Sequence, residues 1–133
     1  MYYTYDRNNS IMIPPPFKRY ITPVFMGDDQ IITEMNFSVH YTEWEPECKI
    51  DKHMHESSME AMCCVSGNGI AEIDGKKYDF VPGSMIVAPP GIEHQIINNG
   101  NELLRVLCVF SPPITGESLR KRAMEAVDNT TSE

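Results

Sequence analysis

Three histidines and one glutamate lie in the middle of the chain, at spacings that suit a metal site. One residue separates His53 from His55, and Glu60 follows after four more. In a β-strand, residues i and i+2 point to the same face with about 6.5–7 Å between their Cα atoms, so two imidazoles can converge on one cation. His94 is remote in sequence and must arrive through the fold. The four side chains predict a site assembled across a β-sheet.

This donor set favours a divalent transition metal. Neutral imidazole is the commonest protein ligand for such ions, and a carboxylate lowers the net charge of the site. Three nitrogens and one oxygen suit Fe, Mn, Ni, Co or Zn without selecting among them. We therefore expect one divalent transition metal ion, of unspecified identity, bound by His53, His55, Glu60 and His94.

Turn residues punctuate the same stretch at regular intervals. With the four candidate ligands they form two blocks, His53-x-His55-x4-Glu60-x6-Gly67 and Gly83-x5-Pro89-x-Gly91-x2-His94-x3-Asn98.

The two blocks resemble the two motifs of the cupin superfamily. The first family motif begins with a glycine, where this chain has Glu47. Since that glycine serves a turn and not the metal, the departure concerns only the shape of the loop. Every other motif position matches, and the resemblance covers roughly residues 35–112. It implies a small single-domain cupin, which is a double-stranded β-helix or jelly-roll barrel, and it does not identify the subfamily.

Composition agrees with one ordinary globular domain. A chain of 133 residues can bury a real core. The formal net charge of −8 disfavours nucleic acid and anionic membranes as partners. No apolar run approaches the roughly 20 residues that a membrane helix needs, and the N-terminus lacks the features of a signal peptide. We therefore expect a cytoplasmic protein. Its four cysteines contain no C-x-x-C pair and are expected to be reduced thiols.

Short apolar segments between turn residues predict an all-β fold. Asp74-Gly75 predicts a two-residue hairpin loop, and residues 103–110 predict a central strand. We expect three parts, which are an N-terminal arm that contributes an interface strand (1–30), the barrel (31–113), and a C-terminal helix and tail (114–133). The pattern predicts the helix itself over residues 117–127.

Strand alternation predicts which side chains line the cavity. Over residues 31–43, the apolar positions place Tyr41 on the inner face and His40 on the polar face, as a solvated or interface histidine. Met62 and Cys64 share the parity of Glu60. We therefore expect Met62, Cys64 and Tyr41 to line a mostly apolar pocket, and we expect Glu60 and Tyr41 to carry the acid–base work.

Three functions remain open at this point. The first is a metalloenzyme acting on a small oxygen-chelating metabolite, by oxygenase, lyase or decarboxylase, or isomerase or cyclase chemistry. The second is a non-catalytic, metal-dependent binding or sensor module, and the third is a storage or structural cupin. In each case the partner is a small molecule and not nucleic acid or membrane. The apolar, proline-rich arm predicts a homodimer.

Overall fold

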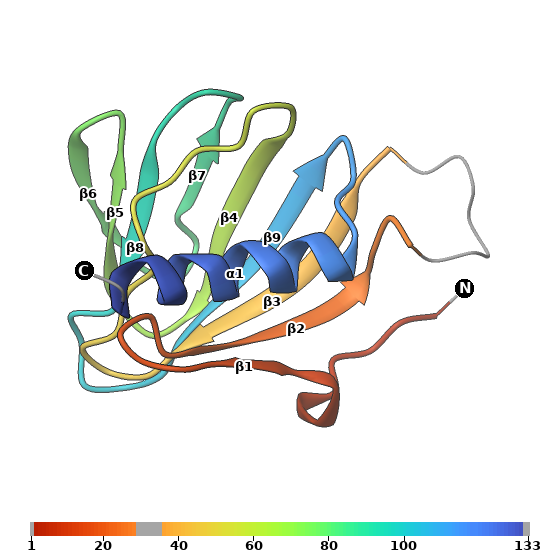
Figure 1. The fold of residues 1–133 in the computed structure, drawn as a ribbon. Helices are drawn as coiled ribbons and strands as arrows, with labels where there is room; N and C mark the ends of the chain where they lie inside the picture. The colour runs from red at the N-terminus through yellow and green to blue at the C-terminus, as the bar shows by residue number, and fades with distance from the viewer. Residues whose placement is uncertain (1, 29–35, 132–133) are drawn as a thin grey trace.

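The computed structural model describes residues 2–28 and 36–131, which form two antiparallel sheets and one long helix (Figure 1). The larger sheet has the order β1-β2-β3-β9-β4-β7, and the smaller has the order β6-β5-β8. This is the all-β jelly-roll architecture predicted from the motifs. The elements are η1 (Arg7–Asn9), β1 (Ile11–Ile13), β2 (Arg19–Phe25), β3 (Ser38–Trp44), β4 (Met59–Ser66), β5 (Gly69–Ile73), β6 (Lys76–Phe80), β7 (Met85–Ala88), β8 (His94–Ile97), β9 (Leu104–Ser111) and α1 (Gly116–Thr131).

Tight turns join the strands where the sequence predicted them. Asp74 and Gly75 connect β5 to β6 with φ values of 50° and 77°, the left-handed backbone of a two-residue hairpin loop. The motif glycine Gly67 has a second constraint. A Cβ atom there would lie 2.5 Å from the carbonyl oxygen of Leu103, so only glycine fits between β4 and the chain entering β9.

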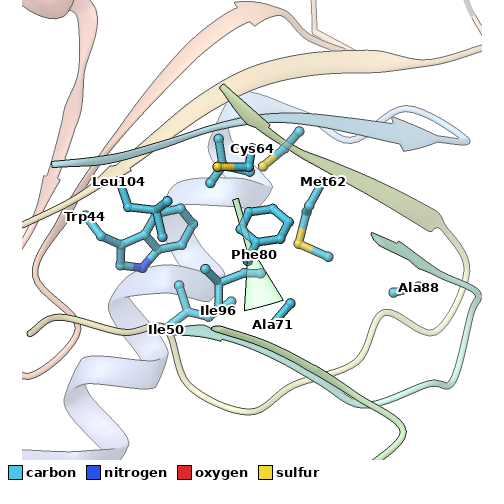
Figure 2. Close-up of a cluster of buried hydrophobic side chains, with 11 residues drawn as sticks. Trp44, Ile50, Met62, Cys64, Ala71, Phe80, Ala88, Ile96 and Leu104 are labelled. Carbon is cyan, nitrogen blue, oxygen red and sulfur yellow. The ribbon is translucent and has the colours of Figure 1, made fainter. Parts of the chain in front are cut away.

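The main core fills the space between the two sheets (Figure 2). Apolar side chains from the inner faces of both sheets meet there, and Phe80 and Leu104 are fully buried. Burying one large apolar side chain stabilises a fold by about 1.5–3 kcal/mol, so this cluster holds the sheets together. Its buried members are Trp44, Ile50, Met62, Cys64, Ala71, Phe80, Ala88, Ile96, Leu104, Val106 and Cys108.

A second core joins the two ends of the chain. Helix α1 lies beside β1 and β2 (Figure 1), and its Leu119, Ala123 and Val127 pack on the side chains of the N-terminal strands. The other members of this second core are Ile11, Ile13, Phe17, Ile21 and Met26. The N-terminal segment therefore packs on its own barrel and extends its larger sheet. The predicted boundary at residues 30 and 31 lies outside the described residues, and the interface role of the arm stays a prediction.

Helix α1 is longer than its predicted span of residues 117–127. The hydroxyl of Thr115 accepts a hydrogen bond from the amide of Ser118 at 3.0 Å, which caps the N-terminus. The helix then continues to Thr131. None of the described helices is both long and apolar enough to cross a membrane.

Candidate metal centre and cavity

The four predicted metal ligands come from three places in the fold. His53 and His55 lie in the extended segment before β4, Glu60 lies on β4, and His94 begins β8. His53 and His94 form an isolated antiparallel bridge, with amide-to-carbonyl distances of 3.1 Å and 2.8 Å. The backbone therefore fixes how far apart the two imidazoles stand. The amide of Gly91 donates to the carbonyl of His55 at 2.8 Å, which ties the second motif to the first.

The structure brings the four side chains together. One ligand atom from each of His53, His55, Glu60 and His94 lies within 4.8 Å of all the others. Glu60 Oε1 is 3.0 Å from Nε2 of His94 and 3.4 Å from Nε2 of His55. The carboxylate thus sits between two imidazoles, with its side chain buried.

Hydrogen bonds prepare the imidazoles as ligands. Nδ1 of His53 lies 2.9 Å from the carbonyl oxygen of Asp51, and Nδ1 of His94 lies 3.1 Å from that of Ile92. A carbonyl only accepts, so each Nδ1 carries a proton, which leaves Nε2 as the ring atom that would bind a metal ion. Nε2 of His55 is buried and has no hydrogen-bond partner among the described residues. An unpaired buried nitrogen beside three further donors fits a metal ion.

Burial and neighbouring groups hold this site in the protonation state that metal binding needs. Burial alone raises the pKa of the Glu60 carboxyl, but the adjacent imidazoles of His55 and His94 outweigh it and bring the pKa well below its usual range. Burial, followed by repulsion from Arg122 and His94, lowers the pKa of His53 to about 2. Near neutral pH the carboxylate is therefore charged and this imidazole is neutral.

A cavity of about 30 Å³ lies beside the four ligands. That space holds one or two water molecules, so a larger molecule enters only if a wall residue moves. Besides the candidate ligands His53, His55 and Glu60, the wall includes Arg19, Ile21, His40, Thr42, Trp44, Ile50, Met62, Cys108, Phe110, Leu119 and Arg122.

Of the three predicted pocket residues, only Met62 lines the cavity. Cys64 has the expected inward parity but lies further along β4, where its thiol approaches the carbonyls of Ser66 and Gly67 in the main core. Tyr41 points to the outer face of the larger sheet. There its ring meets the ring of Tyr5 at 5.6 Å and the guanidinium of Arg105 at 4.7 Å. The prediction that Tyr41 lines the cavity and acts there is therefore wrong.

The strand containing Tyr41 has the opposite parity to the prediction. Its described part begins at Ser38, and residues 31–35 of the predicted strand lie outside the described residues. Ser38, His40 and Thr42 are buried on the inner face, whereas Val39 and Tyr41 are half-buried on the outer one. The prediction failed because it assumed that the apolar side chains face the interior. His40 is thus neither solvated nor on the outer face but part of the cavity wall.

Three basic side chains of the cavity wall were not recognised from the sequence. Arg19 on β2, His40 on β3 and Arg122 on α1 all line the cavity, although they lie outside the two motif blocks. An arginine at a buried parity position inside an apolar strand was the available signal for Arg19, which is only 2% exposed. No local pattern marked Arg122, because its place depends on how α1 packs.

Comparison with known families decides what this assembly is. The model of the cupin domain matches residues 40–110, which is more than half of the chain. The chain belongs to the cupin family. In this cupin the position of the first motif glycine is occupied by Glu47, which adopts φ 65°. The loop therefore keeps the left-handed backbone that glycine would favour.

Individual relatives narrow the comparison. An L-ectoine synthase from Bordetella avium is 39% identical over 88 residues, which is 65% of each chain, so this cupin spans just under two thirds of that relative. An L-ectoine synthase from Teredinibacter turnerae is 30% identical over 111 residues, covering 82% of this chain and 79% of the relative.

Solved structures show the same fold. Ectoine synthase from P. lautus matches with a TM-score of 0.70 at 22% identity, covering 90% of this cupin and 80% of that chain. KdgF from Halomonas sp. also has a TM-score of 0.70, at 18% identity, covering 84% of this cupin and 93% of that chain. At these identities the structural likeness establishes the double-stranded β-helix alone.

Proposed function

We propose that this cupin is a divalent-metal-dependent enzyme acting on a small metabolite that chelates through oxygen. The observation that carries the proposal is the convergence of His53, His55, Glu60 and His94 within 4.8 Å, with Nε2 of His55 buried and unpaired among the described residues. A bound ion would serve as a Lewis acid that polarises a carbonyl or similar oxygen of the metabolite.

Among the reaction classes that the motifs leave open, we favour a lyase or cyclase. The support comes from the name shared by the sequence relatives, L-ectoine synthase. The proposal extends to the reaction class and not to the product, because the match spans just under two thirds of the first of these relatives.

His40 is the proton-transfer group that we propose in place of Tyr41. Burial, opposed by attraction to Glu60, lowers its pKa to about 4, so the ring is neutral near pH 7. Its Nδ1 atom is buried without a hydrogen-bond partner among the described residues, and the ring lines the cavity. The ring of Phe110 stacks on it at 5.6 Å and also meets His55 at 4.7 Å. Phe110 thus orients both imidazoles and excludes water from between them.

Elemental analysis of protein purified without added metal tests the proposal. We expect about one transition metal ion per chain, lost after chelation and restored by adding back the same ion. Screening small oxygen-chelating acids with the loaded protein then separates the two classes of function. Turnover supports the enzyme, whereas saturable binding without turnover supports the binding module. A protein that takes up no ion contradicts the proposal.

The proposal includes a homodimer, formed through the outer face of the larger sheet. Two rows of apolar residues cross β7, β4, β9 and β3 on that face, and the charged Arg105 lies at their edge, against the ring of Tyr41. Exposed Met85 and Val87 belong to these rows, and large contiguous apolar patches are rare on the surface of monomers. A second copy is the partner that this face favours, because a two-fold interface sets one apolar patch against itself. The rows are Met85, Cys63, Leu107 and Tyr41, and Val87, Ala61, Val109 and Val39.

A further inference from the structure

The wall of the cavity contains a buried positive charge outside the two motif blocks. Arg19 is 2% exposed, and the hydrogen bond of its guanidinium runs to the carbonyl oxygen of Phe17 at 3.1 Å. No carboxylate in the described part of the chain lies within ion-pair distance of it. Burial, with repulsion from Arg122, lowers the pKa of Arg19 to about 10, which still leaves it charged near pH 7. A buried charge without a partner is costly, so this arginine has a use.

A second arginine enters the same cavity from the other end of the chain. Arg122 on α1 lines the cavity and forms an ion pair with Asp51 at 3.4 Å, with its side chain 29% exposed. Asp51 therefore offsets the charge of Arg122 and leaves that of Arg19 uncompensated. With a divalent ion on the four ligands, the groups in the cavity carry two positive charges from the ion, one from Arg19 and one negative charge from Glu60. The excess of positive charge favours an anionic ligand.

Uncharged polar atoms point to a ligand at the same place. Trp44 is the cross-strand partner of Arg19 and lines the cavity beside it. Its indole Nε1–H is buried with no acceptor among the described residues, although a buried indole usually finds one. The structure thus provides a donor, a guanidinium and a second, movable guanidinium around one small space.

From this arrangement we infer that Arg19, Arg122 and Trp44 form an anion subsite that binds a carboxylate of the metabolite, in the same cavity as the candidate metal ligands His53, His55 and Glu60. The inference extends the proposed function, because it makes the metabolite a small acid with a carboxylate at one end and a chelating group at the other. A guanidinium and an indole N–H together match the acceptor atoms of a carboxylate. Arg122 stands where it can leave Asp51 and follow the ligand, which enlarges a cavity of about 30 Å³.

Acetate and acetamide test the subsite in metal-free protein, since the two molecules have nearly the same shape and differ in charge. Trp44 is the single tryptophan of the chain, so its fluorescence reports what enters the cavity. At constant ionic strength set with chloride, we expect acetate to change that fluorescence saturably and acetamide to leave it unchanged. Equal responses to both molecules, or no response to acetate, would overturn the inference.

Matched variants assign the effect to the two arginines. Arg19→Gln should weaken acetate binding by about tenfold or more, because charge-assisted hydrogen bonds are lost. Arg122→Gln should weaken it several-fold, and Arg120→Gln, which makes the same charge change on the exposed face of α1, should leave it unchanged. If Arg19→Gln fails to fold, the acetate affinity of Arg122→Gln tests the inference instead. Wild-type affinity in both cavity variants would overturn the inference.

Metal content, measured on the same samples, separates this inference from the proposed function. Both arginine variants should keep one ion per chain after metal is supplied. A wild-type protein that binds acetate but no ion contradicts the metal enzyme and leaves the subsite standing. A protein that binds the ion but not acetate contradicts the subsite alone.

Discussion

Around the cavity, the inner and outer faces of the larger sheet reverse the usual distribution of polar and apolar residues, whereas the rest of the inner face packs into the apolar main core. On the inner face, Ser38, His40 and Thr42 of β3 and Glu60 of β4 are all buried. On the outer face of the same sheet, apolar side chains are half-buried or exposed, and Met85 is 59% exposed. A half-buried sheet normally places its apolar residues inward. The reversal teaches that neither face serves packing alone, since one faces a polar cavity and the other is suited to a partner.

The largest expected effect comes from removing a metal ligand on the inner side. His94→Ala should reduce the metal content from about one ion per chain to nearly none. The backbone bridge holds His94 directly opposite His53, so no other side chain can take the place of the lost imidazole. Elemental analysis after dialysis measures the loss. Glu56→Ala is the control, because this exposed carboxylate stands next to His55 but outside the site. Full occupancy in His94→Ala would show that the inner face does not bind metal as proposed.

The next effect concerns the pH dependence of stability in metal-free protein. The folded pKa of His40 is about 4, below its ordinary 6.5, so the unfolded chain binds the proton more readily between these values. Stability is therefore full above pH 6.5 and falls as the pH drops toward 4. The expected loss from His40 between pH 7 and pH 5 is about 2 kcal/mol.

Urea unfolding at the two pH values measures this loss. His40→Gln should remove the contribution of His40, while His53, whose pKa is lowered in the same direction, keeps part of the slope. An equally steep fall in His40→Gln would mean that the inner face does not hold this imidazole neutral.

A smaller effect on folding, but a clear one on assembly, is expected on the outer face. Met85→Glu places a charge in the apolar rows, where it faces its own copy across a two-fold axis. We expect light scattering to show a dimer for the wild-type protein and a monomer for the variant. The free energy of unfolding of the separated chain should change by no more than about 0.5 kcal/mol, as for most exposed positions. A monomeric wild-type protein would contradict the proposed homodimer through the outer face.

The smallest effect is expected at Tyr41. Tyr41→Phe should leave the metal content and any turnover unchanged, because the hydroxyl lies on the outer side and the ring contacts with Tyr5 and Arg105 remain possible. Thr42→Val is its counterpart one residue further along, on the inner face. It removes a hydroxyl from the cavity wall and should lower turnover. A loss of activity in Tyr41→Phe but not in Thr42→Val would support the sequence prediction that Tyr41 faces the cavity.

Much of the fold was predictable, because local chemistry sets it. The turn at Asp74-Gly75, the glycine at position 67 and the apolar strand over residues 104–111 are each specified by a few neighbouring residues. The clustering of the four candidate metal ligands was predictable as well, since motif spacing and strand geometry leave few other arrangements. Asn98, the last motif residue, is fully buried, and its side-chain amide donates hydrogen bonds to the carbonyl oxygens of Trp44 and Glu102. Its role is therefore structural, and it does not bind the metal.

The rest of the site depended on long-range packing that alternation does not encode. For β3, the pattern gave two faces but not which of them turns inward, and the assumption that apolar means inward placed Tyr41 and His40 on the wrong sides. Cys64 had the right parity but the wrong distance along β4. Arg19 and Arg122 meet only because β2 joins the larger sheet and α1 packs over the second core.

The position of α1 also has a consequence for the order in which the protein becomes competent. Helix α1 follows all the strands, so a chain emerging from the ribosome can pair β2 with β3 and β9 before Arg122 and Leu119 have been released. At that stage the four candidate metal ligands have already been synthesised, while the cavity wall that α1 contributes is still missing. Metal uptake can therefore precede selectivity for the organic ligand during biosynthesis, because the element that completes the wall is the last to arrive.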